Sequence, residues 1–287
     1  PARLLEQLRI GTLPARNSDG SFEHPRYSRV WVKPKGRKGP ATAIFEEGLI
    51  PAQPLGPNQV RVRPLLADIN ANGKWATRDF PIDIARYHQE LGTVLGSAGL
   101  MVVTEDGSEV KHLKPRNLAI MLSGTHDLLV PESYGGSAQA HRSFRILAYE
   151  AVNAFEGSFG QETVLDAIQA VHVEEGVYPF EQLGPVGLVY PTTEHALNVL
   201  GVRKGDRLIV EGATGGTGLA SVQLAKFRGA TVIGTVSSSE KAHEAMAQYG
   251  ADAALNRLNL ADEDAYVGAV QETIGHLTGQ PAPADKV

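Results

Sequence analysis

A glycine-rich turn between two apolar strands is the feature that most constrains the fold of this chain. The turn spans Gly212–Gly218, between an apolar run at 207–210 and a helix predicted over 218–227, with a second apolar strand over 231–236. Glycine permits positive φ and a close approach of the backbone to a phosphate, and the following helix offers unpaired N–H groups to an anion. The stretch therefore predicts a dinucleotide site, with a tight turn that binds nothing as the alternative. The predicted phosphate-binding residues are Gly212, Ala213, Thr214, Gly215, Gly216, Thr217 and Gly218.

Around this turn, predicted strands and helices alternate. Helices are expected over 192–200, 240–249 and 264–277, a short strand over 253–255, and the start of a fourth strand in the last residues. Such alternation is typical of a parallel, doubly wound α/β sheet. Only about half of a six-strand nucleotide-binding sheet is covered. Because the chain also begins without Met, we expect a fragment of a longer polypeptide.

The first half of the chain has the pattern of a small barrel. Strands are expected over 27–33, 59–64 and 117–122, with neighbouring strands over 91–104, loops over 123–161 and a short amphipathic helix over 2–10. Apolar and polar residues alternate over 59–64, as a half-buried strand requires. We therefore predict a lead-in or linker over 1–40, a barrel-like substrate domain over 41–185 and a nucleotide-binding domain over 186–287.

The residues after the second strand bear on which dinucleotide binds. NAD sites usually carry an acidic residue there, which bonds to the ribose 2′-hydroxyl. This chain instead has Ser237 and Ser238, followed by Lys241. Hydroxyls and an ammonium suit a 2′-phosphate, so the sequence predicts NADPH. A helix N-cap formed by Ser239 and Glu240 is the alternative, and the two roles are compatible.

Composition removes several classes of function. The chain has 287 residues, a net charge of -5 and no cysteine, which excludes disulfides, thiolate nucleophiles and cysteine-ligated zinc. Charges of both signs are mixed, so no nucleic-acid surface is predicted. No apolar run is long enough to span a bilayer and no signal peptide is visible, so we expect a cytoplasmic protein. The histidines lack the spacing of a metal motif, and we predict no metal site.

Several segments resemble a known family. The glycine turn is similar to the AxxGGxG turn of zinc-free medium-chain dehydrogenase/reductases. A closer resemblance, over roughly residues 55–287, is to crotonyl-CoA carboxylase/reductases and to the acrylyl-CoA reductase domain of propionyl-CoA synthase. It implies a GroES-like β-barrel domain followed by a Rossmann domain that is truncated at its C-terminus. The segments that carry it are Asp68-Ile-Asn-Ala-Asn-Gly-Lys-Trp75, Asn153-Ala-Phe-Glu-Gly-Ser-Phe-Gly160, Val236-Ser-Ser-Ser-Glu-Lys-Ala242 and Leu255-Asn-Arg257.

The resemblance also implies roles for residues outside the turn. Thr192 would contact the nicotinamide amide, and Arg257 would lie against the cofactor. Asn72 and Lys74 would line the catalytic site, and Glu156 would order the pocket or a dimer loop. Four of these five have a plain structural alternative: a helix cap for Thr192, a polar turn for Asn72 and Lys74, and a surface acid for Glu156.

The implied reaction is reduction of a short, acrylyl-type 2-enoyl-CoA by NADPH. Hydride transfer to Cβ builds negative charge on the thioester oxygen, which nearby donors stabilise. The implied partners are acyl-CoA synthetase and enoyl-CoA hydratase domains of a fused synthase, and a second copy in a homodimer. Reductive carboxylation, quinone or enone reduction and a non-catalytic NADPH-binding scaffold stay open as alternatives.

Overall fold

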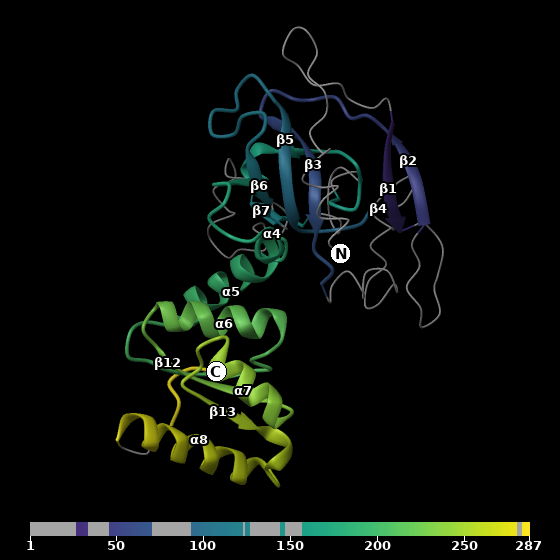
Figure 1. Cartoon of the computed structure of the whole chain (residues 1–287). Helices are drawn as coiled ribbons and strands as arrows, with labels where there is room; N and C mark the ends of the chain where they lie inside the picture. The colour runs from purple at the N-terminus through teal and green to yellow at the C-terminus, as the bar shows by residue number, and fades with distance from the viewer. Residues whose placement is uncertain are drawn as a thin grey trace. The chain divides into compact units, whose positions relative to one another are not determined.

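The computed structural model describes residues 27–33, 46–70, 93–122, 124–126, 144–146, 157–279 and 283–287. It divides into two compact units, Pro1–Leu188 and Val189–Val287 (Figure 1). The helix predicted over 2–10 lies outside the described residues. Within the described ranges, no helix combines the length and apolar character needed to cross a bilayer.

The first unit is built on antiparallel strands. Its main sheet has five strands in the order β10-β6-β5-β3-β9, and a second sheet has the order β2-β1-β4. The register between β3 and β5 shifts between Arg61 and Val62 and again between Pro64 and Leu66. Proline cannot donate to the ladder, which agrees with the second shift. The strands are β1 (Tyr27–Lys33), β2 (Glu46–Pro51), β3 (Gln59–Ala67), β4 (Thr93–Val94), β5 (Gly99–Asp106), β6 (Leu118–Met121), β9 (Thr163–Asp166) and β10 (Ala170–Val173).

The predicted strands over 27–33, 59–64, 91–104 and 117–122 are confirmed in type, but the loop prediction over 123–161 is wrong in part. Two three-residue strands, β7 (Gly124–His126) and β8 (Phe144–Ile146), pair antiparallel within it. A strand of three residues is too short to show a period-two pattern, so it could not be recognised by alternation.

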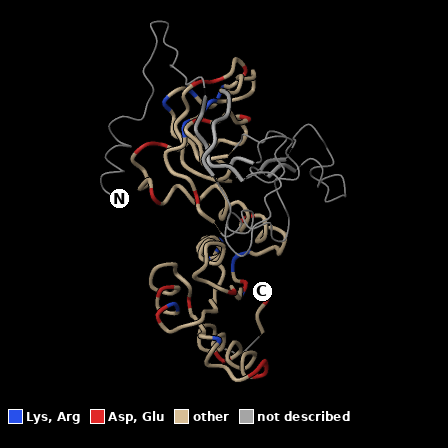
Figure 2. The backbone as a smooth tube through the Cα atoms, turned by 90° about the vertical axis from the view of Figure 1, so that its right-hand side faces the viewer, with Lys and Arg blue, Asp and Glu red and all other residues tan. Residues whose placement is uncertain are grey.

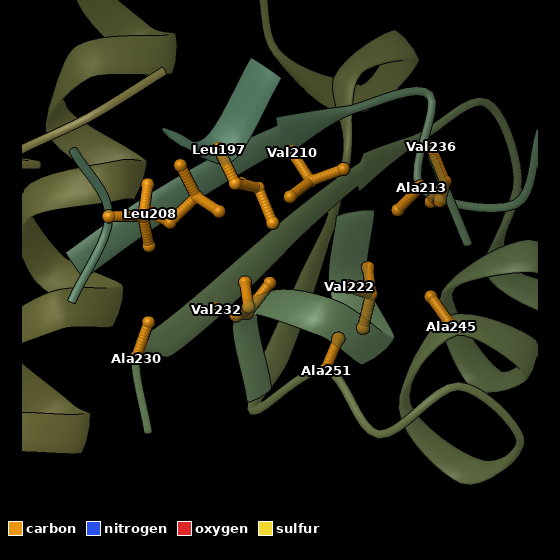
Figure 3. Packing of buried hydrophobic residues seen from close by; sticks show 12 residues of the cluster. Leu197, Leu208, Val210, Ala213, Val222, Ala230, Val232, Val236, Ala245 and Ala251 are labelled. Atoms are coloured by element: carbon orange, nitrogen blue, oxygen red, sulfur yellow. The ribbon is translucent and has the colours of Figure 1, made fainter. Parts of the chain in front are cut away.

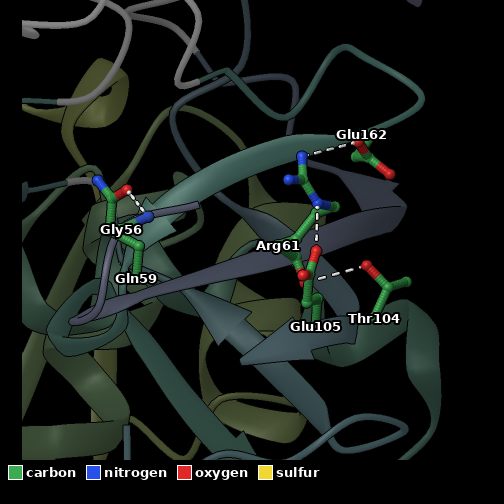
Figure 4. Close-up of polar contacts among 6 residues, drawn as sticks. All are labelled: Gly56, Gln59, Arg61, Thr104, Glu105 and Glu162. Atoms are coloured by element: carbon green, nitrogen blue, oxygen red, sulfur yellow. Dashed lines mark hydrogen bonds and ion pairs between the residues drawn. The ribbon is translucent and has the colours of Figure 1, made fainter. Parts of the chain in front are cut away.

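A partly buried ion-pair cluster joins strands of the main sheet. Arg61, only 7% exposed, donates from Nε to Glu105 at 2.9 Å and from an amino group to Glu162 at 3.1 Å (Figure 4). The hydroxyl of Thr104 donates to the Arg61 carbonyl at 3.2 Å. The cluster ties β3 to β5 and to the residue that precedes β9, so a charge inside the sheet is paired rather than isolated.

The second unit contains the predicted parallel sheet. The strands β11 (Arg207–Glu211), β12 (Thr231–Val236) and β13 (Ala253–Asn256) run parallel in that order. Lys286 forms a parallel bridge to Leu208, on the side of β11 away from β12. The last residues therefore begin a fourth strand beside the first, as predicted, and the α/β fold class is confirmed.

Helices cover both faces of this sheet because its strands are apolar on both sides. Leu208, Val210, Val232 and Val236 join one buried cluster, with residues of α6 (Gly216–Phe227) and α7 (Ser239–Ala247) (Figure 3). The intervening Ile209 and Ile233 point to the other face, where α8 (Glu263–Thr278) packs. Successive side chains of a strand point to opposite faces, so one short run of sequence supplies two cores.

The helix α5 (Val186–Leu200) begins six residues before the predicted start at Thr192 and contains Pro191. Proline inside a helix removes a helical hydrogen bond, so Pro191 would not be expected there from local propensity. Packing explains the difference: Val186 lies against the buried cluster that includes Leu183, the last residue of α4 (Phe180–Leu183). Tertiary contacts thus outweigh local propensity here.

Candidate functional site

The glycine-rich turn lies between β11 and α6, where the sequence predicts a phosphate site. Gly212 has a φ of 62°, the left-handed region that favours glycine. The N–H of Gly215 donates to the Gly212 carbonyl at 2.8 Å, and the N–H of Ala213 donates to Thr235 of β12 at 3.1 Å. No side chain caps α6 at its N-cap residue, Gly215. The first amides of α6 are therefore not covered by a capping side chain, and they provide an anion-binding end.

Gly218 is required by a close approach of two backbone segments. A Cβ atom at this position would lie 2.1 Å from the Gly212 carbonyl oxygen and 2.9 Å from the Cα of Ala213. Gly234 of β12 is similarly constrained, since its Cβ would lie 2.7 Å from the Cβ of Ala213. The turn thus folds back over the start of α6 and against the neighbouring strand, and both contacts depend on missing side chains.

The order of the strands places this turn at the usual ligand site of a doubly wound sheet. The chain passes from β11 to β12 and β13 on one side, and its last residues return to the other side of β11. Ligands of such sheets bind beyond the carboxyl ends of the strands, where the strand order reverses. Here that point is the end of β11, which is where the glycine turn begins.

A group of polar residues, here called the β12–α7 corner, follows the next strand and consists of Ser237, Ser238, Glu240 and Lys241. The Lys241 ammonium donates to the Ser237 hydroxyl at 3.4 Å. Arg257 is exposed and follows β13, whose Asn256 pairs with Val236 of β12. The ends of β12 and β13 therefore bring Ser237, Lys241 and Arg257 to one edge of the sheet, and their binding of a 2′-phosphate stays a prediction.

Ser238 has a different role from Ser237. Its hydroxyl oxygen accepts from the Lys241 N–H at 3.2 Å and forms the N-cap of α7. The predicted cap at Ser239 is wrong by one residue, because Ser239 is already the first helical residue. The backbone N–H of Glu240 and the Ser238 hydroxyl both bond to the Glu240 carboxylate and hold its pKa below the ordinary value. The Ser238 hydroxyl is thus engaged in capping α7.

The predicted nicotinamide residue, Thr192, is an exposed residue of α5. Its neighbour Thr193 is fully buried, and the Thr193 hydroxyl donates to the Thr217 carbonyl at 3.4 Å. The Tyr190 hydroxyl donates to Gln223, and burial raises its pKa. These two contacts join α5 to α6 and were not predicted from the sequence. Thr193 lies four residues before the buried Leu197, on the same face of α5, and this spacing could have indicated that Thr193 is buried.

The predicted catalytic residues Asn72, Lys74 and Glu156 lie outside the described residues. The described segments that flank Asn72 and Glu156 are anchored to one turn, at 95–98. The Ala98 carbonyl accepts from the Asp68 N–H at 3.1 Å and from the Ser158 hydroxyl at 2.9 Å.

The same turn makes two further contacts. Asn70 donates to the Ser97 hydroxyl at 3.1 Å, and the Ser158 N–H donates to Gly96 at 2.9 Å. Gly96 has a φ of 93°, and a Cβ there would lie 2.2 Å from the Ser158 hydroxyl. The turn therefore holds together two segments far apart in the sequence, one ending two residues before Asn72 and the other beginning just after Glu156.

Positions occupied by basic and by acidic residues both occur along the described parts of both units (Figure 2). Among the described residues there is no group of three or more histidine and acidic side chains that could hold a metal ion. The chemistry that the described residues offer is anion binding at the glycine turn and at the edge formed by the ends of β12 and β13.

Comparisons with known proteins agree with this fold. Residues 216–283 match the family model described as zinc-binding dehydrogenase. A crotonyl-CoA carboxylase/reductase of Cereibacter sphaeroides is 25% identical over 240 residues, which are 81% of this chain and 54% of that protein. The pikromycin polyketide synthase component PikAII of Streptomyces venezuelae is 30% identical over 186 residues, which are 64% of this chain and 4% of that protein. The chain thus spans about half the length of the first relative and a small part of the second.

A solved structure supports the fold. The crotonyl-CoA carboxylase/reductase AntE, solved in complex with NADP, matches with a TM-score of 0.73 and 24% sequence identity. The match covers 91% of this chain and 69% of the AntE chain. The chain therefore has the fold of that reductase, and its residues 216–283 match the zinc-binding dehydrogenase family model.

Proposed function

We propose that this chain binds NADPH and reduces a short, acrylyl-type 2-enoyl-CoA to the saturated acyl-CoA. The observation that carries the proposal is the pairing of an anion-binding glycine turn, at Gly212–Gly218, with a basic edge at the end of the next strand. A dinucleotide with a 2′-phosphate presents its anionic groups at these two places.

On the cofactor side, each group has a distinct task. The pyrophosphate would be held by the first amides of α6, which the turn leaves without a capping side chain. The 2′-phosphate would be held by Ser237, Lys241 and Arg257, since hydroxyl, ammonium and guanidinium groups all donate to phosphate. The relative solved with NADP has the same fold, which supports this assignment.

On the substrate side, bound NADPH supplies a hydride to Cβ of the enoyl thioester. Asn72 and Lys74 are proposed to donate hydrogen bonds to the thioester oxygen, where negative charge develops. Glu156 is proposed to order the pocket. The anchoring of the segments next to Asn72 and Glu156 to one turn supports their acting together. The reaction consumes one proton at Cα, and its products are NADP⁺ and the saturated acyl-CoA.

The proposed context is a fused synthase of the propionyl-CoA synthase kind, in a cytoplasmic homodimer, with acyl-CoA synthetase and enoyl-CoA hydratase domains. A relative of which this chain matches only 4% supports a multidomain setting. A second candidate function, reductive carboxylation, is favoured by the name of the Cereibacter sphaeroides relative. In that reaction CO2 takes the place of the proton at Cα, and the product carries a new carboxylate.

The test follows NADPH oxidation at 340 nm with acrylyl-CoA, crotonyl-CoA and a simple quinone, with and without bicarbonate. Fast oxidation with a short enoyl-CoA and slow oxidation with the quinone is the expected result. A carboxylated product in the presence of bicarbonate would establish the second candidate. NADPH binding without turnover on any acceptor would instead indicate a scaffold.

A matched pair of variants connects the result to the site. We expect K241Q to weaken NADPH binding about tenfold, because a phosphate loses one charged donor. The control K204Q makes the same charge change at an exposed residue. Lys204 precedes the amino end of β11, whereas Lys241 follows the carboxyl end of the parallel strand β12. Equal affinities in the two variants would contradict the role given to Lys241.

A further inference from the structure

Glu240 is an acidic residue inside the basic corner described above. It lies in the first turn of α7, between the N-cap Ser238 and Lys241. It therefore lies two residues after Ser238 and directly before Lys241, whose ammonium contacts Ser237. The side chain is exposed and therefore free to face a ligand at this edge.

The position of Glu240 has opposite effects on the helix and on a bound phosphate. A carboxylate in the first turn favours α7, because it interacts with the positive end of the helix dipole. Lys241 and Arg257 bring two positive charges to this edge, and the Glu240 carboxylate reduces the net charge there to +1. It also bonds to the Ser238 hydroxyl, one of the donors that the sequence assigned to the 2′-phosphate.

We propose that Glu240 is a specificity-determining residue that weakens the preference of this chain for NADPH over NADH. The inference rests on the proposed binding of NADPH, and it concerns how the same site treats the two cofactors. A 2′-phosphate would meet the Glu240 carboxylate as a like charge, whereas the 2′-hydroxyl of NADH can donate to a carboxylate. Lys241 and Arg257 favour the phosphate, and Glu240 opposes them.

The experiment measures the dissociation constants of NADPH and NADH by fluorescence titration of the protein at low ionic strength. We expect E240Q to tighten NADPH binding about fivefold, because one unit charge is removed within a helical turn of a doubly charged phosphate. NADH binding is not expected to tighten. E240K is expected to raise the ratio of the two affinities further, and added salt should shrink both effects.

A control variant separates this effect from a change in overall charge. E272Q removes the same charge from an exposed residue of α8, and it is expected to leave both affinities unchanged. The far-ultraviolet circular dichroism of E240Q checks that α7 still forms.

The outcomes distinguish this inference from the cofactor proposal. A wild type that binds NADPH, with an unchanged NADPH to NADH ratio in E240Q, would overturn the role of Glu240 and leave the cofactor proposal intact. A ratio that rises equally in E272Q would also overturn it. Failure of wild type and both variants to bind NADPH would overturn the cofactor proposal, and this inference with it.

Discussion

Replacing Gly218 with alanine provides a quantitative test of the glycine turn. The added Cβ would lie 2.1 Å from the Gly212 carbonyl oxygen and 2.8 Å from its carbonyl carbon. Both obstructing atoms belong to the backbone, so no side chain can rotate away. The variant must shift either the turn or the start of α6, and either movement changes the predicted phosphate site.

The magnitude follows from two opposing contributions. Alanine favours a helix over glycine by about 1 kcal/mol. Forcing an extra methyl group into a packed site costs about 1–3 kcal/mol, and a backbone contact of this kind belongs at the upper end. We therefore expect G218A to lower the free energy of unfolding by about 2 kcal/mol and to weaken NADPH binding at least tenfold.

Two other glycines provide matched controls. A Cβ at Gly268, in the exposed middle of α8, would meet nothing within 4 Å, so G268A should gain the full helical preference of about 1 kcal/mol. A Cβ at Gly216, two residues before Gly218, would meet Val189 at 3.4 Å, so G216A should be close to neutral. The three variants make the same chemical change in three different environments.

Urea unfolding followed by the helical circular dichroism signal measures the three stabilities. Titration with NADPH measures the affinities. The expected order of stability is G268A, then wild type and G216A, then G218A. If G218A were as stable as wild type and bound NADPH as tightly as wild type, the close approach of Gly218 to Gly212 would not be the reason for glycine at this position.

Three further predictions concern charges and a buried hydroxyl. The Arg207 guanidinium lowers the pKa of Asp285 from 3.8 to about 2. The ionised Asp285 therefore stabilises the fold fully above about pH 4, and this contribution is lost as the pH falls toward 2. We expect D285N to flatten the acid limb of a curve of unfolding free energy against pH. R61M should destabilise the first unit by about 3 kcal/mol in urea, because two carboxylates lose their guanidinium, whereas E105Q should cost less because Glu105 is 40% exposed. Y266F should leave the melting temperature unchanged or raise it slightly, because the buried Tyr266 hydroxyl has no partner among the described residues.

The parallel sheet could be predicted because its strands carry an unusual pattern. The runs at 207–210 and 231–236 are apolar on both faces, and each is followed by a turn and a helix. Strands of the first unit could be predicted where apolar and polar residues alternate, as at 59–64. The three-residue strands β7 and β8 could not be, because they are shorter than one detectable repeat.

The candidate site could be predicted where its chemistry depends on residues close together in the sequence. The glycine turn and the Ser237–Lys241 pair are local, so the sequence could place them after neighbouring strands, and their binding of a cofactor stays a prediction. The N-cap differed by one residue, because Ser237, Ser238 and Ser239 offer the same chemistry and only the helix start distinguishes them. The contact of Thr193 with Thr217 spans 24 residues and depends on how α5 packs.

The bridge between Lys286 and Leu208 also affects how the second unit behaves among other molecules. An uncovered outer strand of a sheet is a template on which another chain can add, and natural proteins protect such edges with short charged segments. The residues that lie along β11 here, Asp285 and Lys286, carry charges of both signs, and the Asp285 N–H and the Lys286 carbonyl occupy β11 groups that a foreign strand would use. The Arg207 carbonyl and the Ile209 N–H on this side of β11 are thus already paired and are not offered to another strand.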